Sequence, residues 1–493
     1  MEAGAELRVT GDPAALTAIF QGLKGDRARS VKEVSTYYDT ADGRIWRRGY
    51  ALRVRQTAGG RVLALERQDG AAGPARAWTC RIVGPVVDIG LLPPGAPRSE
   101  IGAILPEELR PRFKSETKRT RKTLKLDEGA IEVALEIGHI AASTRRAELA
   151  ELQFRMSDGP TAVLLEHVKP LLGQRRVTVC ARSEVARGME LADDRPPASL
   201  KAAKLALRAS DTIDQAVRKI VAITTQQIVG NLAAAADGRD PEGVHQLRVA
   251  LRRLKSAMTL FKDQLAGHAG PLGESTRHAL KGLGPARDLD VFLAETLPPV
   301  MDGSGDNADL MQLAKSAETR RREAYTSVRR LVRDPQFNRF LLDLMIVSEE
   351  GGLVARGRNA PLRPTAAALL AKRHKKVLKA GRNFAHLPNA QRHEVRIALK
   401  KLRYACDYFQ ALFPKKAARP YLKRLASLQE DLGRLNDATV AEHLVDELVA
   451  DDAEAAIGGA MIKGWYWHRL QTVEPHMLEA WQDFAEAKPF WRT

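Results

Sequence analysis

The chain has 493 residues, which is long enough for two or three domains, each with its own core. Hydrophobic residues make up 44% of it and charged residues 28%, values typical of a soluble globular protein. No apolar run is long enough to span a bilayer and the first residues lack a signal-peptide core, so we expect neither membrane insertion nor secretion. The three cysteines are too widely spaced for a disulfide framework or a zinc site, which favours a reduced, cytoplasmic setting.

The charge balance points to a class of partner. Lys and Arg number 78 against 60 Asp and Glu, which gives a net charge of +18. An excess of this size predicts polyanionic partners such as nucleic acid, acidic lipid or a phosphate polymer. The aromatic content of 5% is low for a surface that stacks single-stranded bases, so nucleic acid is the less favoured partner.

The first part of the chain, residues 1–192, is predicted to be rich in strands. Short β-prone stretches recur there between Gly- and Asp-bearing turns, and one helix is expected over 161–172, ending near Pro170. The segment 193–202 carries adjacent prolines and shows no periodicity, so we expect a linker there.

From residue 203 to 490 the pattern changes to long helices rich in Ala, Leu, Arg and Lys, interrupted by loops expected at 301–309 and 349–364. This part contains an internal repeat. Residues 244–261 match 392–409 at an offset of 148, and 283–291 match 432–440 at an offset of 149. Two features repeated in the same order predict a duplicated helical unit, with halves at about 203–345 and 360–490.

Each repeat carries a basic stripe along one helix. In the first repeat the stripe occupies an arc of roughly 80° at 100° per residue, and its members are His245, Arg248, Arg252 and Lys255. The opposite face is predicted to enter the core through Leu247, Ala250, Leu251 and Leu254. The second repeat reproduces the stripe with His393, Arg396, Lys400 and Arg403 against Val395, Ala398, Leu399 and Leu402. Further cations flank or extend these stripes, namely Arg253, Lys401 and Lys376 with its neighbours His374, Lys375, Lys379 and Arg382.

Two interpretations of the stripes stay open. Charged helix faces are usually solvated, but an all-basic stripe without interleaved Glu, present in both repeats, favours a binding surface for an anion. The two histidines could contact phosphate or have a structural role in the core, and metal binding is the less favoured interpretation. The Arg287–Asp288 pair and its counterpart Asn436–Asp437 are expected to form salt bridges or caps, with ligand contact as the second reading.

The duplicated segments VHQLRVALRRLKSAM and HEVRIALKKLRYA resemble the CHAD domain, a histidine-containing helical family built from two four-helix bundles. The resemblance covers roughly 200–490. Members of that family bind inorganic polyphosphate through basic surfaces, so the resemblance implies this ligand, whereas the residues alone indicate only a polyanion. It also implies binding by the stripe residues of both repeats and by Arg253, Lys376 and Lys401.

The first part resembles the CYTH family of triphosphate-tunnel proteins through YYDTADGRIWRRGYALRVRQ (37–56), IEVALEIG (131–138) and ELQFRMSDG (151–159). The resemblance implies a closed antiparallel β-tunnel in which basic side chains hold a triphosphate and carboxylates hold Mg²⁺ or Mn²⁺. The implied phosphate ligands here are Arg8, Arg53, Arg55 and Arg119. The implied metal ligands are Glu6, Glu132, Glu136 and Glu151.

The acidic motif of that family is incomplete in this chain. The opening Glu-x-Glu-x-Lys strand is replaced by Gly4-Ala5-Glu6-Leu7-Arg8, and the late one by Glu151-Leu152-Gln153-Phe154-Arg155. A further carboxylate position is occupied by Trp78. Loss of hard oxygen ligands should weaken divalent-cation binding, so we expect a tunnel that is weak or inactive as a phosphohydrolase.

The sequence therefore predicts an α+β, multidomain protein: an antiparallel β-tunnel followed by an all-α duplicated domain. Its predicted function is binding of inorganic polyphosphate in the cytoplasm, in association with polyphosphate granules. One alternative is a metal-dependent inorganic triphosphatase that acts on tripolyphosphate delivered by the helical domain. The other is a general binder of nucleic acid and other polyanions.

Overall fold

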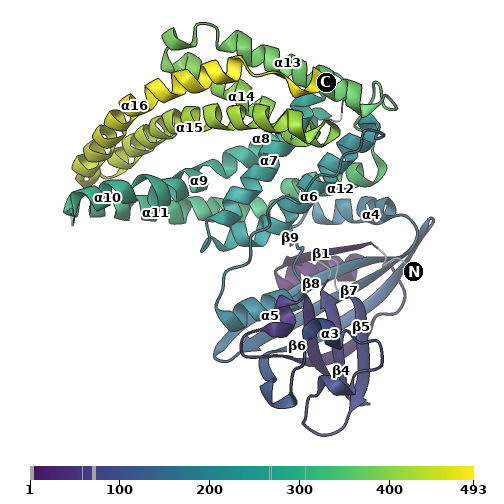
Figure 1. Ribbon diagram of the computed structural model, residues 1–493. Coiled ribbons are helices and arrows are strands. Elements are labelled where there is room, and N and C mark those ends of the chain that lie inside the picture. The colour runs from purple at the N-terminus through teal and green to yellow at the C-terminus, as the bar shows by residue number, and fades with distance from the viewer. Residues whose placement is uncertain are drawn as a thin grey trace. The chain divides into compact units, whose positions relative to one another are not determined.

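The computed structural model describes residues 5–57, 59–68, 74–265, 267, 269–305 and 307–492. The chain divides into two compact units. The sheet unit contains Met1–Leu200, Val229–Gly243 and Val332–Leu342, and the helical unit contains Lys201–Ile228, Val244–Leu331 and Asp343–Thr493. These ranges combine an antiparallel sheet with a mostly helical part, and the predicted fold class is confirmed (Figure 1).

In the part of the sheet unit that the structure describes, nine strands pair antiparallel in the order β5-β4-β3-β2-β6-β7-β8-β1-β9. Their bounds are β1 Glu6–Gly11, β2 Arg29–Asp39, β3 Tyr50–Thr57, β4 Gly60–Gln68, β5 Pro74–Ile82, β6 Arg110–Leu126, β7 Gly129–Ala142, β8 Arg145–Asp158 and β9 Val177–Val179. Among the described residues β5 and β9 are the two edges, and no ladder closes the sheet between them, so the expectation of a closed tunnel is wrong although the antiparallel sheet itself is present. The sequence pattern did not identify β5 or β9.

Alternation along the strands separates an apolar face from a polar one. Leu7 and Val9 of β1 are buried on the apolar face, whereas Glu6 and Arg8 point to the polar face. The helices of residues 1–200 in this unit are α1 Pro13–Gly22, α2 Arg44–Arg47, α3 Arg98–Ile101, α4 Thr161–Leu172 and α5 Glu184–Asp193. Helix α4 spans the predicted range and holds Pro170 in its last turn.

Within the described residues, eleven α-helices follow α5. Their bounds are α6 Ile213–Asp237, α7 Glu242–Leu260, α8 Ala269–Gly282, α9 Gly284–Val291, α10 Pro298–Ser304, α11 Ala308–Val332, α12 Pro335–Glu350, α13 Leu362–Ala380, α14 Asn389–Phe409, α15 Lys415–Asp451 and α16 Ala456–Ala485. Figure 1 shows the two longest, α15 and α16, lying side by side. No helix within the described ranges combines the length and the apolar character needed to cross a membrane.

The loop predicted at 301–309 is shorter than expected. Helix α10 continues to Ser304, and α11 begins at Ala308. Val300 and Leu310 are buried on the two sides of the connection, so packing extends both helices into a Gly- and Asp-rich stretch. Gly305 ends α10 with φ of 64°, a conformation that glycine adopts without steric cost.

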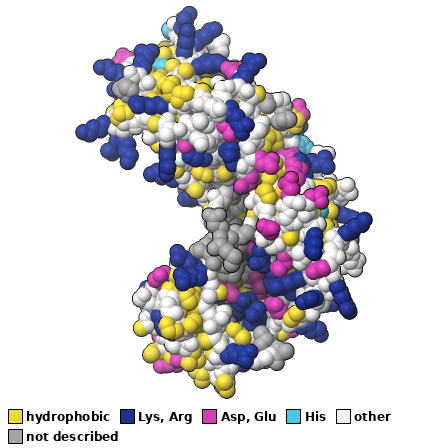
Figure 2. All heavy atoms as spheres, turned by 90° about the vertical axis from the view of Figure 1, so that its right-hand side faces the viewer, with side chains coloured by type: hydrophobic (Ala, Val, Ile, Leu, Met, Phe, Trp, Pro, Cys, Tyr) yellow, Lys and Arg dark blue, Asp and Glu magenta, His cyan; other side chains and the backbone are white. Residues whose placement is uncertain are grey.

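The two repeat helices, α7 and α14, bury the faces that the periodicity predicts. Leu247, Leu251 and Leu254 are fully buried in α7, as are Leu399 and Leu402 in α14. Ala398 differs from the prediction because it is only partly buried. Figure 2 shows Lys and Arg side chains spread over the visible face among Asp and Glu, so charge alone does not single out a site there.

Candidate functional site

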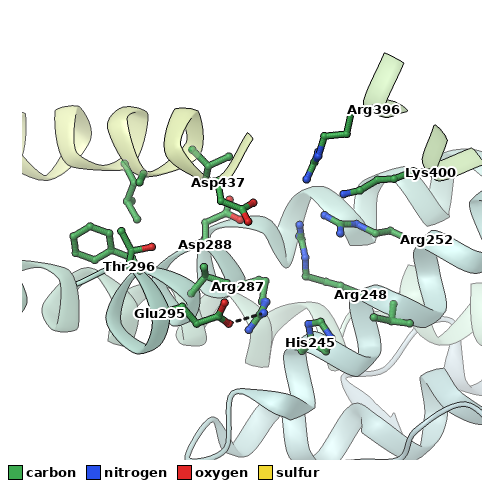
Figure 3. A pocket seen from close by; sticks show the side chains of 16 residues that line it. His245, Arg248, Arg252, Arg287, Asp288, Glu295, Thr296, Arg396, Lys400 and Asp437 are labelled. Atoms are coloured by element: carbon green, nitrogen blue, oxygen red, sulfur yellow. Dashed lines mark hydrogen bonds and ion pairs between the residues drawn. The ribbon is translucent and has the colours of Figure 1, made fainter. Parts of the chain in front are cut away.

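Both repeats contribute cations to one cavity of about 430 Å³ in the helical unit. Arg248 and Arg252 reach it from α7, and Arg396 and Lys400 reach it from α14. Figure 3 shows these four side chains converging on the same opening. Two stripes that are far apart in the sequence therefore face a common space.

The rest of the cavity wall comes from α9, from the π-helical turn Phe292–Thr296 that follows it, and from α15. Arg287 lies within 3.4 Å of Glu295 in an ion pair. Asp288 and Asp437, which occupy equivalent positions in the two repeats, lie near each other on the opposite side of the opening from Lys400 (Figure 3). The remaining lining residues are His245, Val249, Val291, Phe292, Thr296, Val440, Ala441 and Leu444.

The lining residues include five Arg and Lys side chains and three carboxylates, so cations are in excess. Arg248 is only 9% exposed, and its Nη1 donates a hydrogen bond of 2.9 Å to the Leu280 carbonyl. Its buried Nε has no acceptor among the residues that the structure describes. A buried guanidinium with an unused donor is costly unless an anion accepts from it.

Burial, and after it the repulsion between neighbouring cations, lowers the pKa values of Arg248 and Lys400. Burial, followed by repulsion from Arg252, lowers the pKa of Arg248 to about 10. Burial, followed by repulsion from Arg396 and Arg252, lowers the pKa of Lys400 to about 8. Burial raises the pKa of Asp288, although the neighbouring arginines act in the opposite direction. An anion in the cavity would relieve the repulsion between the cations.

Of the eleven residues predicted to bind polyphosphate, five line this cavity and six lie outside it. The five are His245, Arg248, Arg252, Arg396 and Lys400. Arg403 forms an ion pair of 3.2 Å with Asp407 and lines a neighbouring pocket of about 400 Å³ together with Lys400. Lys376 and Lys401 line a smaller pocket of about 150 Å³.

The other three predicted residues have different surroundings. The Arg253 guanidinium carbon lies 5.8 Å from the centre of the Tyr408 ring, in a cation–π contact. Lys255 and His393 are exposed. The duplicated histidines thus differ, because His245 is half-buried and lines the cavity whereas His393 does not.

His374, which the sequence groups with a basic surface cluster, is instead buried, and its Nδ1 lies 2.8 Å from the Tyr421 hydroxyl. The sequence reasoning also missed Glu295 and Thr296, for which the repeat gives no signal. For Arg287 and Asp288 the sequence favours salt bridging or capping over ligand contact. Their presence in a duplicated motif was the available signal that they lie at the same site as the stripes.

The predicted tunnel residues lie on the polar face of the sheet. The strand register places Arg119 of β6 opposite Glu136 of β7, and Glu136 opposite Glu151 of β8. Tyr37 of β2, whose side chain is buried, lies opposite Arg53 of β3. Arg8, Arg53, Arg55 and Arg119 therefore share this face with all four predicted metal ligands, Glu6, Glu132, Glu136 and Glu151.

Each of these carboxylates is bound to an arginine. Glu6 accepts from Arg8, and Glu151 accepts from Arg187 of α5. Glu132 lies 3.2 Å from Arg155. Glu136 accepts from the Thr117 hydroxyl at 2.8 Å and lies 3.8 Å from Arg119.

The face therefore does not fit the divalent cation that the tunnel resemblance implies. No group of three or more His, Cys, Asp or Glu side chains within the described residues could hold a metal ion. A hard cation such as Mg²⁺ or Mn²⁺ needs several free oxygen ligands, and here arginines already neutralise the four candidates.

Two of the comparisons with known proteins concern the helical part of the chain. A family model described as the CHAD domain matches residues 219–446. The CHAD domain structure from the plant Ricinus communis is 30% identical, with a TM-score of 0.52, and the match covers 59% of this chain and 98% of that chain. PptA from Streptomyces chartreusis is 16% identical, with a TM-score of 0.45, over 55% of this chain and 100% of that chain.

A Hippeastrum protein described as a candidate adenylyl cyclase with a dominant triphosphatase activity is 14% identical, with a TM-score of 0.26, over 38% of this chain and 95% of that chain. The match with the Ricinus domain covers nearly the whole length of that domain. The residues that the family model matches include α7 and α14, the two helices whose basic stripes face one cavity in this chain. The chain belongs to the CHAD domain family.

Proposed function

We propose that the chain binds inorganic polyphosphate in the cavity between α7 and α14. The observation that carries the proposal is the convergence of Arg248, Arg252, Arg396 and Lys400, drawn from both repeats, on one opening. Membership of the CHAD family supports a phosphate polymer rather than another polyanion.

The chemistry of the cavity suits a chain of phosphates. Arginine offers a planar fork of donors to phosphate oxygens, and lysine offers a compact point charge. An anion that enters the cavity can accept a hydrogen bond from the unused Nε of Arg248 and reduce the repulsion between the cations. Both effects make the free energy of binding more favourable. A linear polymer can also leave the cavity and reach the cations of the neighbouring pocket, where Lys400 and Arg403 lie.

Two exposed cations on α7 give a matched test. Arg252 lines the cavity, and Lys255, less than one helical turn away, lies outside it. Both side chains are exposed, so reversal of either charge should leave the fold intact.

We expect Arg252→Glu to weaken binding of labelled polyphosphate to the full chain by roughly tenfold or more, because it removes a charge-assisted contact and adds a repulsive charge. Lys255→Glu should change the affinity by less than about threefold. Equal losses in the two variants would mean that general surface charge, and not the cavity, binds the polymer. Duplex DNA added at equal phosphate concentration should displace polyphosphate poorly, and efficient displacement would favour the general polyanion binder.

A further inference from the structure

The first turns of α16 have an apolar side that faces away from the core of the helical unit. Its residues Ile457, Ala460, Gly464 and Trp467 are all exposed, and they lie within an arc of roughly 80° at 100° per residue. Ile457 is 62% exposed and Trp467 is 67% exposed. We call these four residues the α16 stripe. The stripe is unusual because the outer face of a surface helix normally carries polar side chains.

The opposite side of α16 is tightly packed, which keeps the stripe on the outside. Ile462 is fully buried in the core that α16 shares with α11 and α15. Two glycines let α16 approach these helices. A Cβ added at Gly458 would lie 2.5 Å from the Asp309 carbonyl oxygen of α11, and one added at Gly459 would lie 2.8 Å from the Val445 side chain of α15.

Gly464 differs from these two glycines. A Cβ added there would meet no described atom of the chain within 4 Å. Glycine lowers the stability of a helix relative to alanine, so packing within one chain gives no reason for it. Between the exposed Ile457 and Trp467, a glycine allows the backbone of another molecule to approach closely.

The α16 stripe is complementary to itself when two copies of the helix lie antiparallel. Residues 457 and 467 are each five positions from Ile462, and residues 460 and 464 are each two positions from it. A pairing centred on Ile462 therefore places Trp467 opposite Ile457 of a second copy. It also places Gly464 opposite Ala460 of that copy. Large side chains then meet at the two ends and small ones at the centre, where the helices approach each other closely.

The charge around the stripe also fits a second copy. Between residues 456 and 467 the one charged residue is Lys463, which forms an ion pair with Asp446 of α15. The same register brings the exposed Glu454, in the turn before α16, near the exposed His468 of the second copy, and a carboxylate can pair with an imidazole. A helix that binds anionic lipid instead has Lys and Arg around its apolar face.

We propose that a second copy of this chain covers the α16 stripe, with the two helices antiparallel and centred on Ile462. The stripe is roughly 15 Å long at 1.5 Å per residue, so it buries less than the about 800 Å² per partner of a standard interface. We therefore expect a reversible dimer with a Kd on the order of 10 μM. The interface lies outside the polyphosphate cavity and does not depend on it, because none of the four stripe residues lines that cavity.

The test is sedimentation equilibrium of the full chain over a range of protein concentrations. Trp467→Lys should raise the Kd of the dimer by roughly tenfold or more, because it removes an apolar contact and places a charge in the interface. Gln482→Lys is the matched control, since it adds the same charge to an exposed position of α16 outside the stripe. It should change the Kd by less than about threefold.

Gly464→Leu separates close packing of two helices from non-specific hydrophobic association. The added side chain has room in the single chain, so the thermal unfolding temperature of dilute protein should not fall. The Kd of the dimer should nevertheless rise by roughly tenfold or more, because leucine keeps the two helices apart. Stronger association of this variant would overturn the proposal, since added apolar surface strengthens non-specific association.

Salt distinguishes this dimer from chains that a polyanion bridges. Two copies with a net charge of +18 repel each other, so added salt should leave the dimer unchanged or strengthen it, whereas it weakens bridging by a polyanion. Three results would contradict the proposal: a monomer at every concentration, association that salt abolishes, or equal effects of Trp467→Lys and Gln482→Lys. Binding of phosphatidylcholine vesicles by a monomeric chain would contradict it too, and would assign the stripe to a lipid surface.

Discussion

Lys400 shows how position within the cavity changes the chemistry of one side chain. Its pKa falls to about 8 because it is buried next to Arg396 and Arg252. Arg248 stays charged under the same conditions because its pKa, although lowered by burial, is about 10. At mildly alkaline pH the charge of the cavity therefore varies through Lys400.

This difference predicts a pH dependence of binding. A polyanion stabilises the charged ammonium, so Lys400 must take up a proton on binding above pH 8. We expect the affinity for polyphosphate to fall as pH rises through the Lys400 pKa of about 8, by up to about tenfold per pH unit.

Lys400→Arg should abolish this fall, since a guanidinium stays charged across the whole range. The measurement is a binding titration of both proteins at fixed ionic strength between neutral and mildly alkaline pH. A fall of the same size in Lys400→Arg would assign the dependence to another group.

At the level of elements, α7 and α14 are similar in sequence but differ in their contacts. His245 of α7 lines the cavity, whereas His393 of α14 is exposed. Next to His393, Arg392 is buried and forms an ion pair of 2.7 Å with Glu474 of α16. The first turn of α14 is thus fixed against α16 by a residue that does not contact the cavity.

The two histidines therefore give a paired prediction. His245→Ala should weaken polyphosphate binding by roughly threefold to tenfold, because it removes a polar group from the cavity wall. His393→Ala should leave the affinity unchanged within about twofold. The measurement compares the polyphosphate affinities of the two full-length variants. Equal losses of affinity would show that the two repeats act symmetrically.

The sequence predicts which faces of the repeat helices are buried, but only some of the residues that line the cavity. The 3.6-residue periodicity identifies the apolar faces of α7 and α14, and four stripe cations indeed lie together. Lys255 and Arg403 belong to the same stripes, yet they lie outside the cavity. Periodicity tells which side chains lie within about 100° of one another around a helix. It does not tell which turns of the two helices lie opposite each other, and these turns determine which side chains reach the cavity.

For the whole molecule, the net charge of +18 indicates a polyanion but no location, since Figure 2 shows cations distributed among carboxylates on the visible face. The proposed polyphosphate site is a cavity in which cations are close together and partly buried. Binding should then combine a general electrostatic attraction with specific contacts to phosphate oxygens.

The electrostatic part predicts a strong dependence on salt. Neutralising several phosphates releases condensed counterions, so log Kd should rise linearly with log salt concentration, with a slope of roughly 0.7–0.9 per contact. Arg252→Glu should reduce the slope by about one, and Lys255→Glu by much less. A flat response to salt in the unmodified protein would contradict electrostatic binding.

The sequence by itself determined the strand-rich first part, the helical second part, the duplication and the basic stripes, because these are carried by local periodicity and by repetition. Only the tertiary structure decided which charges are free. Glu151 and Arg187 are 36 positions apart and come from β8 and α5, yet they pair with each other. Arg248 and Lys400 are separated by about half of the helical part and yet line one cavity. Pairing depends on how whole elements pack, and that packing buries some charges as neutral pairs and leaves others facing an open cavity.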